Sequence, residues 1–557
     1  MKKKKKKYII TAAFPYTNGY IHIGHLSGVF IPADIYTRYL RSINKKVIFI
    51  SGSDEYGTSI LIKSLKSKKK KEDIINKYHN YIKKYLYIYN ISLDNYYRTS
   101  DKLHHNISKK IFKRLYFNNF FLKKKNYQYY DNIYNQFLAD RYIIGTCPYC
   151  KYNNSFYDQC NNCGKIIKEY KLLNPLSILS KKKPILKQTF NFYISFKKYK
   201  KLILNIIKKF KKRKIKKNII NTMISFLKNN LNDDRSMTRD LDWGIKIPIK
   251  NENLKNKVLY VWFESLIGYI SCTIDWAKKN KKKWQKYWKN KNNILINFIG
   301  KDNIIFHSIL LPIIFKNFNK KLIIPYYINS NEFLNFKKKK ISKSKKNKIY
   351  LHKFLKYYPN MQDSLRYTLI MDMPEKKDTN FTWKKFLLYN NSILVGILGN
   401  FLNRVIIFIN KYFNKKIPKP KKLNKKDLIF LKKIKKYPKK ICKLIKKFKF
   451  KLSLCKFIKL ARLGNKYLSV KKPWDLKKSK KDIKKIIYIS AQIVGIISHL
   501  SYIFLPNTNK KLLKILNIKK CNIKKLLKLK EILPYNHKIK KSKLLFKKII
   551  FLKKNDN

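Results

Sequence analysis

The chain has 557 residues, and its 132 Lys and Arg against 29 Asp and Glu give a formal net charge of +103. At about 150 residues per domain, this length predicts three or four domains. Hydrophobic residues make up 45% of the chain, which excludes disordered and collagen-like proteins, and the 14 glycines and 16 prolines are too few for long flexible linkers.

The positive charge alone does not identify a nucleic-acid-binding protein. Lysines are spread along the whole chain rather than gathered in one stripe, and Lys, Asn, Ile, Tyr and Phe are frequent together, as in an AT-biased coding sequence. We therefore attribute most of the charge to compositional drift, although the excess still disfavours basic partners and suits a polyanion.

The first element expected is a buried strand at residues 8–14 (YIITAAF), followed by a turn at 15–19 and a helix that opens near His22. A second short strand at 47–50 leads into the segment S-G-S-D-E-Y-G. Strand, glycine turn, helix and strand form the opening of a doubly wound α/β domain.

Two uncharged stretches, 8–33 and 486–509, are long enough to resemble membrane spans. Because the first contains Pro15 and a polar turn, we interpret it as strand, turn and helix rather than as a signal peptide. The second contains Gln492 and Pro506, and we expect a buried helix of a bundle there. The sequence therefore predicts no association with a membrane.

An inserted subdomain is expected from about residue 115, where aromatic residues and Asn become frequent and a cysteine cluster follows. Strand signals return at 258–263 and 294–299, as if the α/β sheet resumed, and 331–350 is a loop rich in Lys and Ser. From about residue 386 the apolar residues recur at three- and four-residue spacing, which is typical of helices.

Four of the eight cysteines form two C-x-x-C pairs, C-P-Y-C and C-N-N-C, separated by nine residues. This spacing predicts a closed, structural zinc site with four cysteine ligands: Cys147, Cys150, Cys160 and Cys163. A redox-active dithiol pair, or a knuckle that no longer holds metal, would leave the same pattern. The other cysteines are scattered, which indicates a reducing compartment rather than a disulfide framework.

Two short motifs suit phosphate chemistry. In H-I-G-H, His22 and His25 can donate hydrogen bonds to phosphate oxygens near a helix start, and Gly24 lets a nucleotide approach the backbone. In K-I-S-K-S, Lys340 and Lys343 can clamp a leaving polyphosphate. Each motif alone is weak, because surface histidines and lysine runs without such a role are common.

In their order along the chain, these motifs resemble the class I aminoacyl-tRNA synthetases in the form of methionyl-tRNA synthetase. A-F-P-Y-T-N-G-Y-I-H-I-G-H (13–25) resembles the ATP-binding signature, and S-G-S-D-E-Y-G-T (51–58) resembles the amino-acid-binding loop. Segments similar to the family's active-site motifs follow: R-S-M-T-R-D-L-D-W-G (235–244), Y-V-W-F-E-S-L-I-G-Y (260–269) and N-F-I-G-K-D-N-I-I-F-H (297–307). N-E-F-L-N-F (331–336) precedes K-I-S-K-S as in the family, and L-G-N-F-L-N-R (398–404) and K-K-P-W (471–474) resemble parts of its anticodon-binding domain.

The resemblance spans about residues 8–510 and implies a Rossmann-like, doubly wound parallel sheet with an inserted zinc-knuckle subdomain and a C-terminal α-helical bundle. The expected divisions are 1–115 and 233–330 for the two halves of the catalytic domain, 116–232 for the inserted connective subdomain, 331–385 for the K-I-S-K-S loop and stem-contact region, and 386–557 for the helical anticodon-binding domain.

The resemblance also implies the reaction: methionine and ATP give methionyl-adenylate and pyrophosphate, and the methionyl group passes to the 3′ end of tRNA(Met), elongator and initiator. ATP, with Mg²⁺, would be held by His22, Gly24, His25, Arg239, Asp302 and Lys343. The residues implied as catalytic are His22, His25, Lys340 and Lys343. Because the methionine carboxylate itself attacks the α-phosphate, catalysis would depend on alignment and charge stabilisation.

For the amino acid, the resemblance implies that Asp54 pairs with the α-ammonium group. The walls around the side chain would be Phe14, Tyr16, Trp262, Tyr269 and His307, and aromatic walls suit a polarisable thioether. The anticodon would be recognised by Asn400, Arg404 and Trp474. The first two share one helix face, and an indole can stack on an unstacked base.

The sequence departs from the family at E-S-L (264–266), where D-A-P is usual, and by position Ser265 and Leu266 line or support the methionine pocket. Lysines also crowd the loop at 337–348. The chain ends soon after the helical segment, so we expect no C-terminal OB-fold extension, a monomer, and a cytoplasmic enzyme.

Two other functions fit the sequence less well. A synthetase for another apolar amino acid is disfavoured, because no large editing insertion is present and Y-V-W-F and P-Y-T-N-G favour methionine. A non-catalytic RNA-binding zinc protein descended from a synthetase is disfavoured by His22, His25, Asp54 and Lys343, which a binding module does not need.

Overall fold

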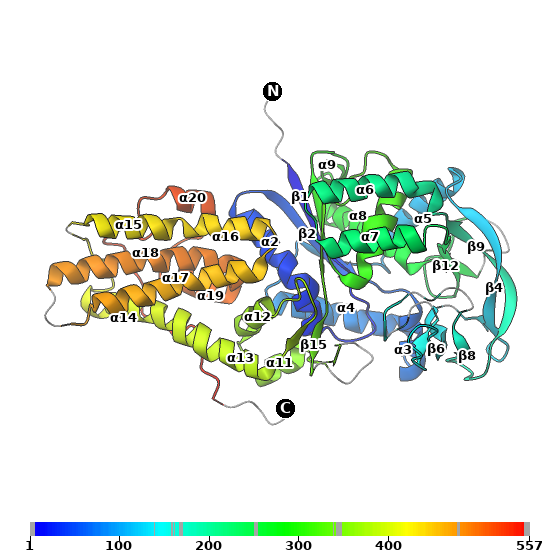
Figure 1. Ribbon diagram of the computed structural model, residues 1–557, viewed down its shortest axis with the longest axis horizontal. Helices are drawn as coiled ribbons and strands as arrows, with labels where there is room; N and C mark the ends of the chain where they lie inside the picture. Colours follow the sequence, from blue (N-terminus) through cyan, green and yellow to red (C-terminus); the bar gives the residue numbers. More distant parts are fainter. Residues whose placement is uncertain are drawn as a thin grey trace.

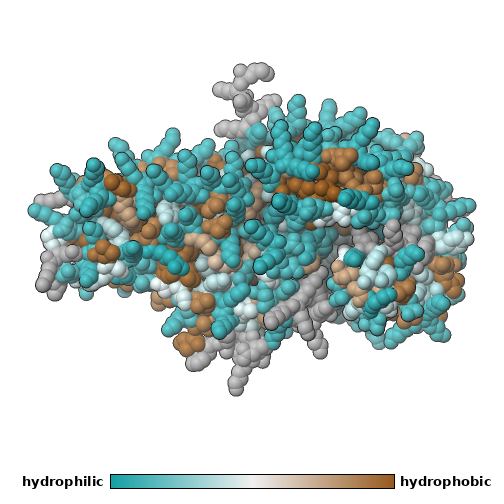
Figure 2. Space-filling view, viewed as in Figure 1, coloured by the Kyte–Doolittle hydropathy of each residue, from teal (hydrophilic) through white to brown (hydrophobic). Residues whose placement is uncertain are grey.

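The computed structural model describes residues 6–550, apart from 139, 158–159, 161, 166, 168–170, 250–253, 255, 338, 341–347, 421 and 476–478. Figure 1 shows a part built around sheets on one side and a bundle of long helices on the other, with α2 between them. Hydrophilic side chains cover most of the face seen in Figure 2, as the even spread of lysines predicts.

The central sheet has five parallel strands in the order β14-β13-β1-β2-β3. The strands are β1 (Lys7–Ala12), β2 (Lys46–Ser53), β3 (Asn95–Arg98), β13 (Ile294–Gly300) and β14 (Tyr327–Asn331). The order runs outward in both directions from the β1–β13 boundary, which confirms the doubly wound fold class. Loops at the carboxyl ends of β1 and β13 diverge there, and this is where such sheets bind ligands.

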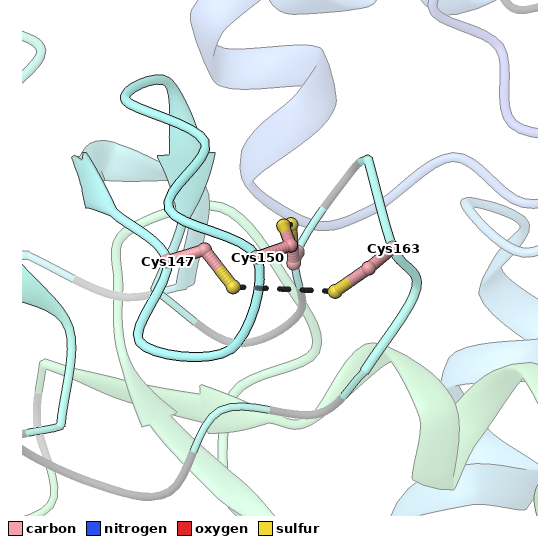
Figure 3. A group of neighbouring side chains, drawn as sticks. Cys147, Cys150 and Cys163 are labelled. Atoms are coloured by element: carbon pink, nitrogen blue, oxygen red, sulfur yellow. Dashed lines mark hydrogen bonds between the residues drawn. The ribbon is translucent and has the colours of Figure 1, made fainter.

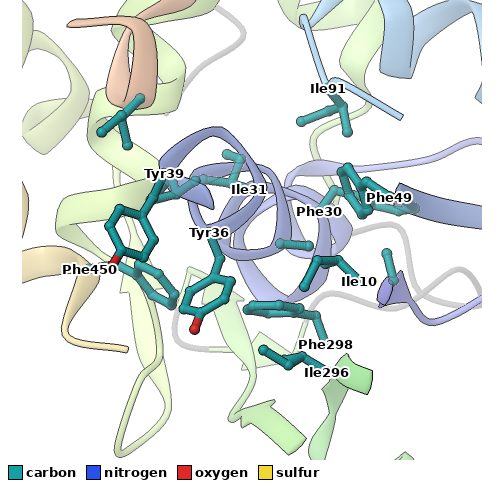
Figure 4. Packing of buried hydrophobic residues seen from close by; sticks show 14 of the residues in the cluster. Ile10, Phe30, Ile31, Tyr36, Tyr39, Phe49, Ile91, Ile296, Phe298 and Phe450 are labelled. Carbon is teal, nitrogen blue, oxygen red and sulfur yellow. The ribbon is translucent and has the colours of Figure 1, made fainter. Parts of the chain in front are cut away.

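Helices cover both faces of this sheet and connect its strands. They are α1 (Ile23–His25), the π-turn η1 (Leu26–Phe30), α2 (Ile31–Ser42), α3 (Thr58–Ser67), α4 (Lys71–Ile88), α5 (Lys102–Phe117), α8 (Val261–Lys279), α9 (Gln285–Trp288), the π-turn η6 (Phe306–Leu310) and α10 (Leu311–Phe318). Figure 4 shows Tyr36 and Tyr39 of α2 beside Phe298 of the sheet and Phe450 of the bundle. One continuous core therefore joins the two parts.

The strand expected at 258–263 is only partly correct. β12 (Lys257–Leu259) is short, and it pairs with β11 (Thr238–Asp240) rather than with the central sheet. Helix α8 begins at Val261, because the apolar residues after it continue at helical spacing as far as Ala277. A short run of aromatic and β-branched residues fits a strand or a buried helix equally well, so periodicity over six residues could not decide between them.

In its described residues, the insertion after α5 contains two antiparallel sheets and two α-helices. One sheet has the order β10-β9-β4-β5 and the other β7-β6-β8. The elements are β4 (Leu122–Asp131), β5 (Gln136–Phe137), β6 (Ile143–Thr146), β7 (Ser155–Phe156), β8 (Leu173–Ser177), β9 (Ile185–Ile194), α6 (Lys200–Lys212), α7 (Lys217–Asn229) and β10 (Arg235–Ser236).

After β14 the chain forms a small three-stranded sheet and then the bundle. The connecting elements are β15 (Leu334–Phe336), β16 (Lys339–Lys340), α11 (Leu351–Tyr357), α12 (Gln362–Met371) and β17 (Thr379–Phe381). The bundle elements are α13 (Trp383–Leu388), η7 (Tyr389–Gly399), α14 (Asn400–Tyr412), α15 (Lys425–Lys435), α16 (Tyr437–Lys446), α17 (Phe450–Lys471), α18 (Lys480–Phe504), α19 (Pro506–Ile515) and α20 (Ile523–Lys528). The helical prediction for this region is confirmed.

Two helical segments of the described chain are long and apolar enough to cross a membrane by length and composition alone. Lys480–Phe504 is 94% buried over its most apolar window, which is the behaviour of the bundle-core helix expected there. Trp383–Tyr412 is 44% buried. Residues 8–33, the other uncharged stretch, form β1, a turn and the start of the α1–α2 helix, as predicted.

A buried ionic cluster joins the central sheet to the bundle. Asp34 of α2 accepts hydrogen bonds from Arg38 Nε at 2.7 Å and from an Arg366 NH₂ group at 2.5 Å, and all three side chains are buried. The Ser92 amide and hydroxyl donate to its other carboxylate oxygen. Burial opposes ionisation, but the two guanidinium groups and the Ser92 hydrogen bonds lower the pKa of Asp34 to about 2.

We predict that Asp34→Asn destabilises the protein by about 3–5 kcal/mol, because it leaves two buried guanidinium groups without their anion. Since the folded-state pKa lies below the ordinary 3.8, the contribution is present above pH 4 and is lost as the pH falls toward 2. Urea unfolding at neutral pH measures the loss. Lys279→Gln, which removes an exposed i,i+4 pair with Asp275, is the control and should cost below about 1 kcal/mol. Equal losses in the two variants would contradict the assignment.

Candidate functional site

The H-I-G-H segment opens the helix that follows β1. His22 has an extended backbone and is the N-cap residue, with its Nδ1 accepting from the Gly24 amide at 3.2 Å. Nδ1 of His25 accepts from the His22 amide at 3.4 Å. With both Nδ1 atoms used as acceptors, each neutral ring carries its proton on Nε2. The capping geometry therefore selects the tautomer in which Nε2–H is a donor.

Three chain segments meet beside this helix start. The Asp54 amide donates to the Pro15 carbonyl, and the Thr17 amide donates back to the Asp54 carbonyl. On the other side, the Ile23 amide donates to the Ile349 carbonyl at 3.1 Å. The ends of β1 and β2 and the segment just after K-I-S-K-S are thereby held together.

The K-I-S-K-S loop is described only at its edges. The backbone of Lys340 ends β16 and pairs with Asn335 of β15. Lys343 lies outside the described residues. The segment beyond the loop returns to the helix start, where Tyr350 forms a β-bridge with His22. Both ends of the loop are therefore anchored, and its far end is anchored at H-I-G-H.

Arg239 and Asp302 come from different elements, β11 and the turn after β13. Arg239 of β11 stacks its guanidinium group over the Tyr260 ring, 3.9 Å from the ring centroid, and donates to two nearby backbone carbonyls. Asp302 is exposed in the turn after β13. A Cβ atom at Gly300 would lie 2.6 Å from Asp302 Oδ1, so a larger residue there would displace this carboxylate.

The aromatic residues predicted as pocket walls form one cluster. Phe14 lies edge-on to Tyr269 with ring centroids 5.0 Å apart, and Tyr16 lies edge-on to Trp262 at 6.4 Å. Phe14 fits only because two neighbours lack a side chain: a Cβ atom at Gly52 or Gly268 would lie 2.8 Å from its ring. Asp54, also buried, stands next to Tyr16 through a β-bridge.

His307 completes this cluster as a neutral side chain. Its Nδ1–H donates to the Asn303 carbonyl at 3.0 Å, so its Nε2 accepts from the Tyr269 hydroxyl at 2.8 Å. Burial lowers the pKa of His307 to about 4 and also raises the pKa of Tyr269. Both groups are uncharged at neutral pH, so this part of the site suits an uncharged ligand group.

The structure adds two residues that the sequence reasoning missed. Phe306 stacks face to face on Trp262, with ring centroids 3.8 Å apart and planes within 10°. Arg235 lies on Phe306 in turn, 5.2 Å from its centroid. Only their places in the sequence could have indicated these two residues. Phe306 precedes His307, and Arg235 begins the motif that contains Arg239.

The four cysteines of the insertion converge as their spacing predicts. Their Sγ atoms lie within 4.8 Å of one another, with Cys147 and Cys163 at 4.0 Å (Figure 3) and Cys150 and Cys160 at 3.7 Å. A tetrahedral metal with metal–sulfur bonds of about 2.3 Å separates its ligands by roughly 3.8 Å, which these distances fit. The site can hold one metal ion with four thiolate ligands and no open position.

The two cysteine turns share one backbone design. The Lys151 amide donates to the Cys147 carbonyl, and the Gly164 amide donates to the Cys160 carbonyl. The fourth residue after the first cysteine is left-handed in both turns, with φ of 54° at Lys151 and 75° at Gly164. Each C-x-x-C pair is therefore built on the same backbone turn, which directs its two thiols toward the centre of the cluster.

In the bundle, Arg404 of α14 lies over the Trp474 ring, 4.6 Å from its centroid, and Trp474 is 44% exposed. Asn400, exposed at the start of α14, is one helical turn before Arg404. Residues distant in sequence are thus brought to one surface, with an indole face beside a guanidinium group.

A doubly wound parallel sheet with H-I-G-H at its carboxyl edge, a cysteine knuckle in the insertion and a helical bundle after the sheet defines a class I aminoacyl-tRNA synthetase. The family described as tRNA synthetases class I (M) matches residues 8–406, and the anticodon binding domain of methionyl tRNA ligase matches residues 417–556. The chain therefore belongs to the methionine–tRNA ligase family.

Curated relatives and solved structures agree with this assignment. Methionine–tRNA ligases from Christiangramia forsetii and Pyrococcus furiosus are 43% and 38% identical, covering 93% and 97% of this chain and 74% and 75% of their own lengths. The ligase from Flavobacterium psychrophilum is 41% identical over 98% of this chain and 79% of its own. The fold also matches the crystal structure of Mycobacterium tuberculosis methionyl-tRNA synthetase bound by methionyl-adenylate, with a TM-score of 0.78, 19% identity, and coverage of 98% of this chain and 100% of that one.

Proposed function

We propose that the cluster at the carboxyl edge of the sheet activates methionine with ATP and that the chain transfers the product to the 3′ end of tRNA(Met), elongator and initiator. The observation that carries the proposal is the meeting of Asp54, the H-I-G-H helix start and the aromatic cluster around Tyr269. A carboxylate oxygen of methionine attacks the α-phosphorus of ATP, and pyrophosphate leaves.

The ATP side of the site consists of donors and cations. His22 and His25 donate through Nε2–H to phosphate oxygens, and Gly24 leaves the backbone accessible. Lys340 and Lys343 close on the pyrophosphate, Arg239 acts near the phosphates and Asp302 accepts from the ribose. Mg²⁺ bound with ATP would neutralise phosphate charge. Catalysis rests on alignment and on stabilising charge that develops on the leaving group, because no side-chain nucleophile is required.

The methionine side has one anion and otherwise neutral walls. Asp54 pairs with the α-ammonium group, and Phe14, Tyr16, Trp262, Tyr269 and His307 surround the side chain. Since His307 stays uncharged at neutral pH, the wall accepts an uncharged thioether. Contacts between sulfur and aromatic rings add about 0.3–1.5 kcal/mol each, which favours methionine over aliphatic side chains of similar size.

The proposal also covers the metal site, the anticodon-binding residues, the domain boundaries, the oligomeric state and the location. One structural zinc ion held by Cys147, Cys150, Cys160 and Cys163 stabilises the insertion, and Asn400, Arg404 and Trp474 recognise the anticodon. The domain boundaries expected from the sequence, a monomeric state, a cytoplasmic location and the absence of a membrane association belong to this proposal.

The test is amino-acid-dependent exchange between ATP and pyrophosphate without tRNA. We expect exchange with methionine and not with leucine, isoleucine, valine or cysteine. Exchange with a different amino acid would keep the enzyme class and contradict the pocket. No exchange with any amino acid would favour the RNA-binding alternative.

In the same assay, Asp54→Asn should raise the KM for methionine by about 10- to 100-fold, because a charged hydrogen bond is worth about 1.5–3 kcal/mol. The KM for ATP should change little. Asp73→Asn, an exposed carboxylate on α4, is the matched control. An unchanged methionine KM in Asp54→Asn would remove Asp54 from the pocket.

Elemental analysis should find one zinc ion per chain. Cys160→Ser should lose the metal, because a three-thiolate remnant of a closed site binds zinc far more weakly. Cys455→Ser, an exposed cysteine outside the cluster, should retain it. Retention of full zinc in Cys160→Ser would contradict the ligand set.

Trp474→Ala should leave methionine-dependent exchange intact and reduce tRNA charging at subsaturating tRNA by about 5- to 100-fold, since base stacking on an aromatic ring contributes about 1–3 kcal/mol. Tyr87→Ala, an 82% exposed aromatic residue on α4, controls for loss of surface aromatic area. Equal loss of exchange and charging in Trp474→Ala would indicate a folding defect instead.

A further inference from the structure

On the face of helix α8 away from the aromatic cluster, one histidine of the neighbouring helix α5 contacts two of its polar residues. His104 of α5 lies 2.7 Å from Glu264 through Nε2 and 2.8 Å from Ser271 through Nδ1. All three side chains are fully buried. Glu264 and Ser271 are seven residues apart on α8, so one imidazole spans two turns of the helix.

The pocket residues of α8 lie on its other side. Trp262 and Tyr269 are also seven residues apart, and each is displaced by two residues from the pair that holds His104. Two residues rotate about 200° around a helix, so the two pairs lie on nearly opposite faces. A change in how His104 holds α8 therefore rotates or shifts the pocket walls.

In a neutral pair, the hydrogen-bond directions in this attachment place the proton on Glu264. If the His104 ring is neutral and its Nδ1–H donates to Ser271, whose hydroxyl donates on to the Ile267 carbonyl, then Nε2 is an acceptor. Two groups face Nε2, Glu264 Oε2 at 2.7 Å and Ser108 Oγ at 3.3 Å. The nearer one, Glu264, must then be a donor. Glu264 meets this requirement only as a carboxylic acid with the proton on Oε2.

The surroundings of Glu264 also favour the neutral form. No Lys or Arg forms an ion pair with it in the described part of the chain, and its Oε1 has no hydrogen-bond partner there. A fully buried carboxylate with an unpartnered oxygen is costly, whereas the carbonyl oxygen of a neutral acid is less so. The nearby Glu55 carboxylate, held by Arg98, Ser53 and Ser100, adds repulsion.

The directions in which burial shifts the two pKa values agree with this geometry. Burial, followed by the charge of Glu55, raises the pKa of Glu264 well above its ordinary value. Burial lowers the pKa of His104 to about 3. The shared proton therefore stays on the carboxyl group.

We propose that Glu264 is a neutral acid that donates a hydrogen bond to His104, and that this uncharged pair positions α8 and the methionine pocket. The inference rests on the proposed function, because it takes Trp262 and Tyr269 as pocket walls. Glu264 is a positioning residue that does not touch the substrate. It stands where the family usually has the shorter Asp, whose carboxyl group on this backbone would fall short of His104.

The test compares two substitutions of Glu264. The proposal expects the amide variant to be less impaired than the variant that keeps a carboxyl group. Glu264→Gln keeps the length and supplies an N–H donor in place of the acid proton, so its methionine KM should stay within about twofold of the unaltered enzyme. Glu264→Asp keeps the carboxyl chemistry and withdraws the donor, so its methionine KM should rise by about fivefold or more with little change in the KM for ATP. Glu72→Gln, an exposed residue on α4, is the control.

A Gln variant as impaired as the Asp variant would overturn the proposal, because an N–H donor of the same length would then fail to replace the acid proton. Two unimpaired variants would overturn it as well, because the pair would then position nothing. Infrared difference spectroscopy with ¹³C-labelled Glu gives a readout independent of activity. A protonated-carboxyl band lost in Glu264→Gln is expected, and its absence from the unaltered protein would overturn the neutral pair. Failure of the unaltered enzyme to exchange methionine would instead overturn the proposed function.

Discussion

The arrangement of the whole molecule depends on one buried carboxylate. Asp34 binds Arg38 from its own helix and Arg366 from α12, and both guanidinium groups continue to the last turn of α18. Arg38 donates to the Tyr502 carbonyl and Arg366 to the Phe504 carbonyl. The last carbonyls of a helix have no partner within it and carry partial negative charge, so the two cations satisfy that helix end. A single anion thus fixes the sheet, the connecting region and the bundle at one point.

An aromatic contact next to this cluster adds a second constraint on the same junction. Phe448, in the turn between α16 and α17, lies flat between Tyr36 of α2 and Tyr327 of β14, at centroid distances of 4.7 and 3.9 Å. Its φ of 56° is left-handed, a conformation that costs a non-glycine residue roughly 1–2 kcal/mol. The stacking on both faces offsets that cost. With an ionic and an aromatic attachment, the surface around Trp474 holds a fixed place relative to the sheet edge.

Much of this could be predicted from sequence, and the exceptions have a common cause. The strand at 8–14, the helix near His22 and the cysteine knuckle follow from local pattern, because turn chemistry and ligand spacing are written in neighbouring residues. Contacts between distant segments are not indicated by neighbouring residues. His104 and Glu264 are 160 residues apart, and nothing near either residue indicates the other. The stacking of Phe306 on Trp262 was missed for the same reason, although both stood in recognised motifs.

Glycine is scarce in this chain, and the positions that keep it show where the fold does not accept another residue. Among the described residues, left-handed backbone positions are occupied mostly by asparagine and lysine, and the only glycines among them are Gly57 and Gly164. Asparagine tolerates this conformation through its short polar side chain, and lysine accepts it at a modest cost.

Close approaches allow no such exchange: a Cβ atom at Gly52 would lie 2.5 Å from the Tyr97 carbonyl oxygen, and one at Gly464 would lie 2.3 Å from the Phe401 ring. A strained turn can be offset elsewhere in the fold, whereas a steric overlap beside the aromatic cluster or inside the bundle would displace the elements themselves. The drift toward lysine and asparagine has therefore reached the turns and the surface, while Gly52 and Gly268 still make room for Phe14 in the site.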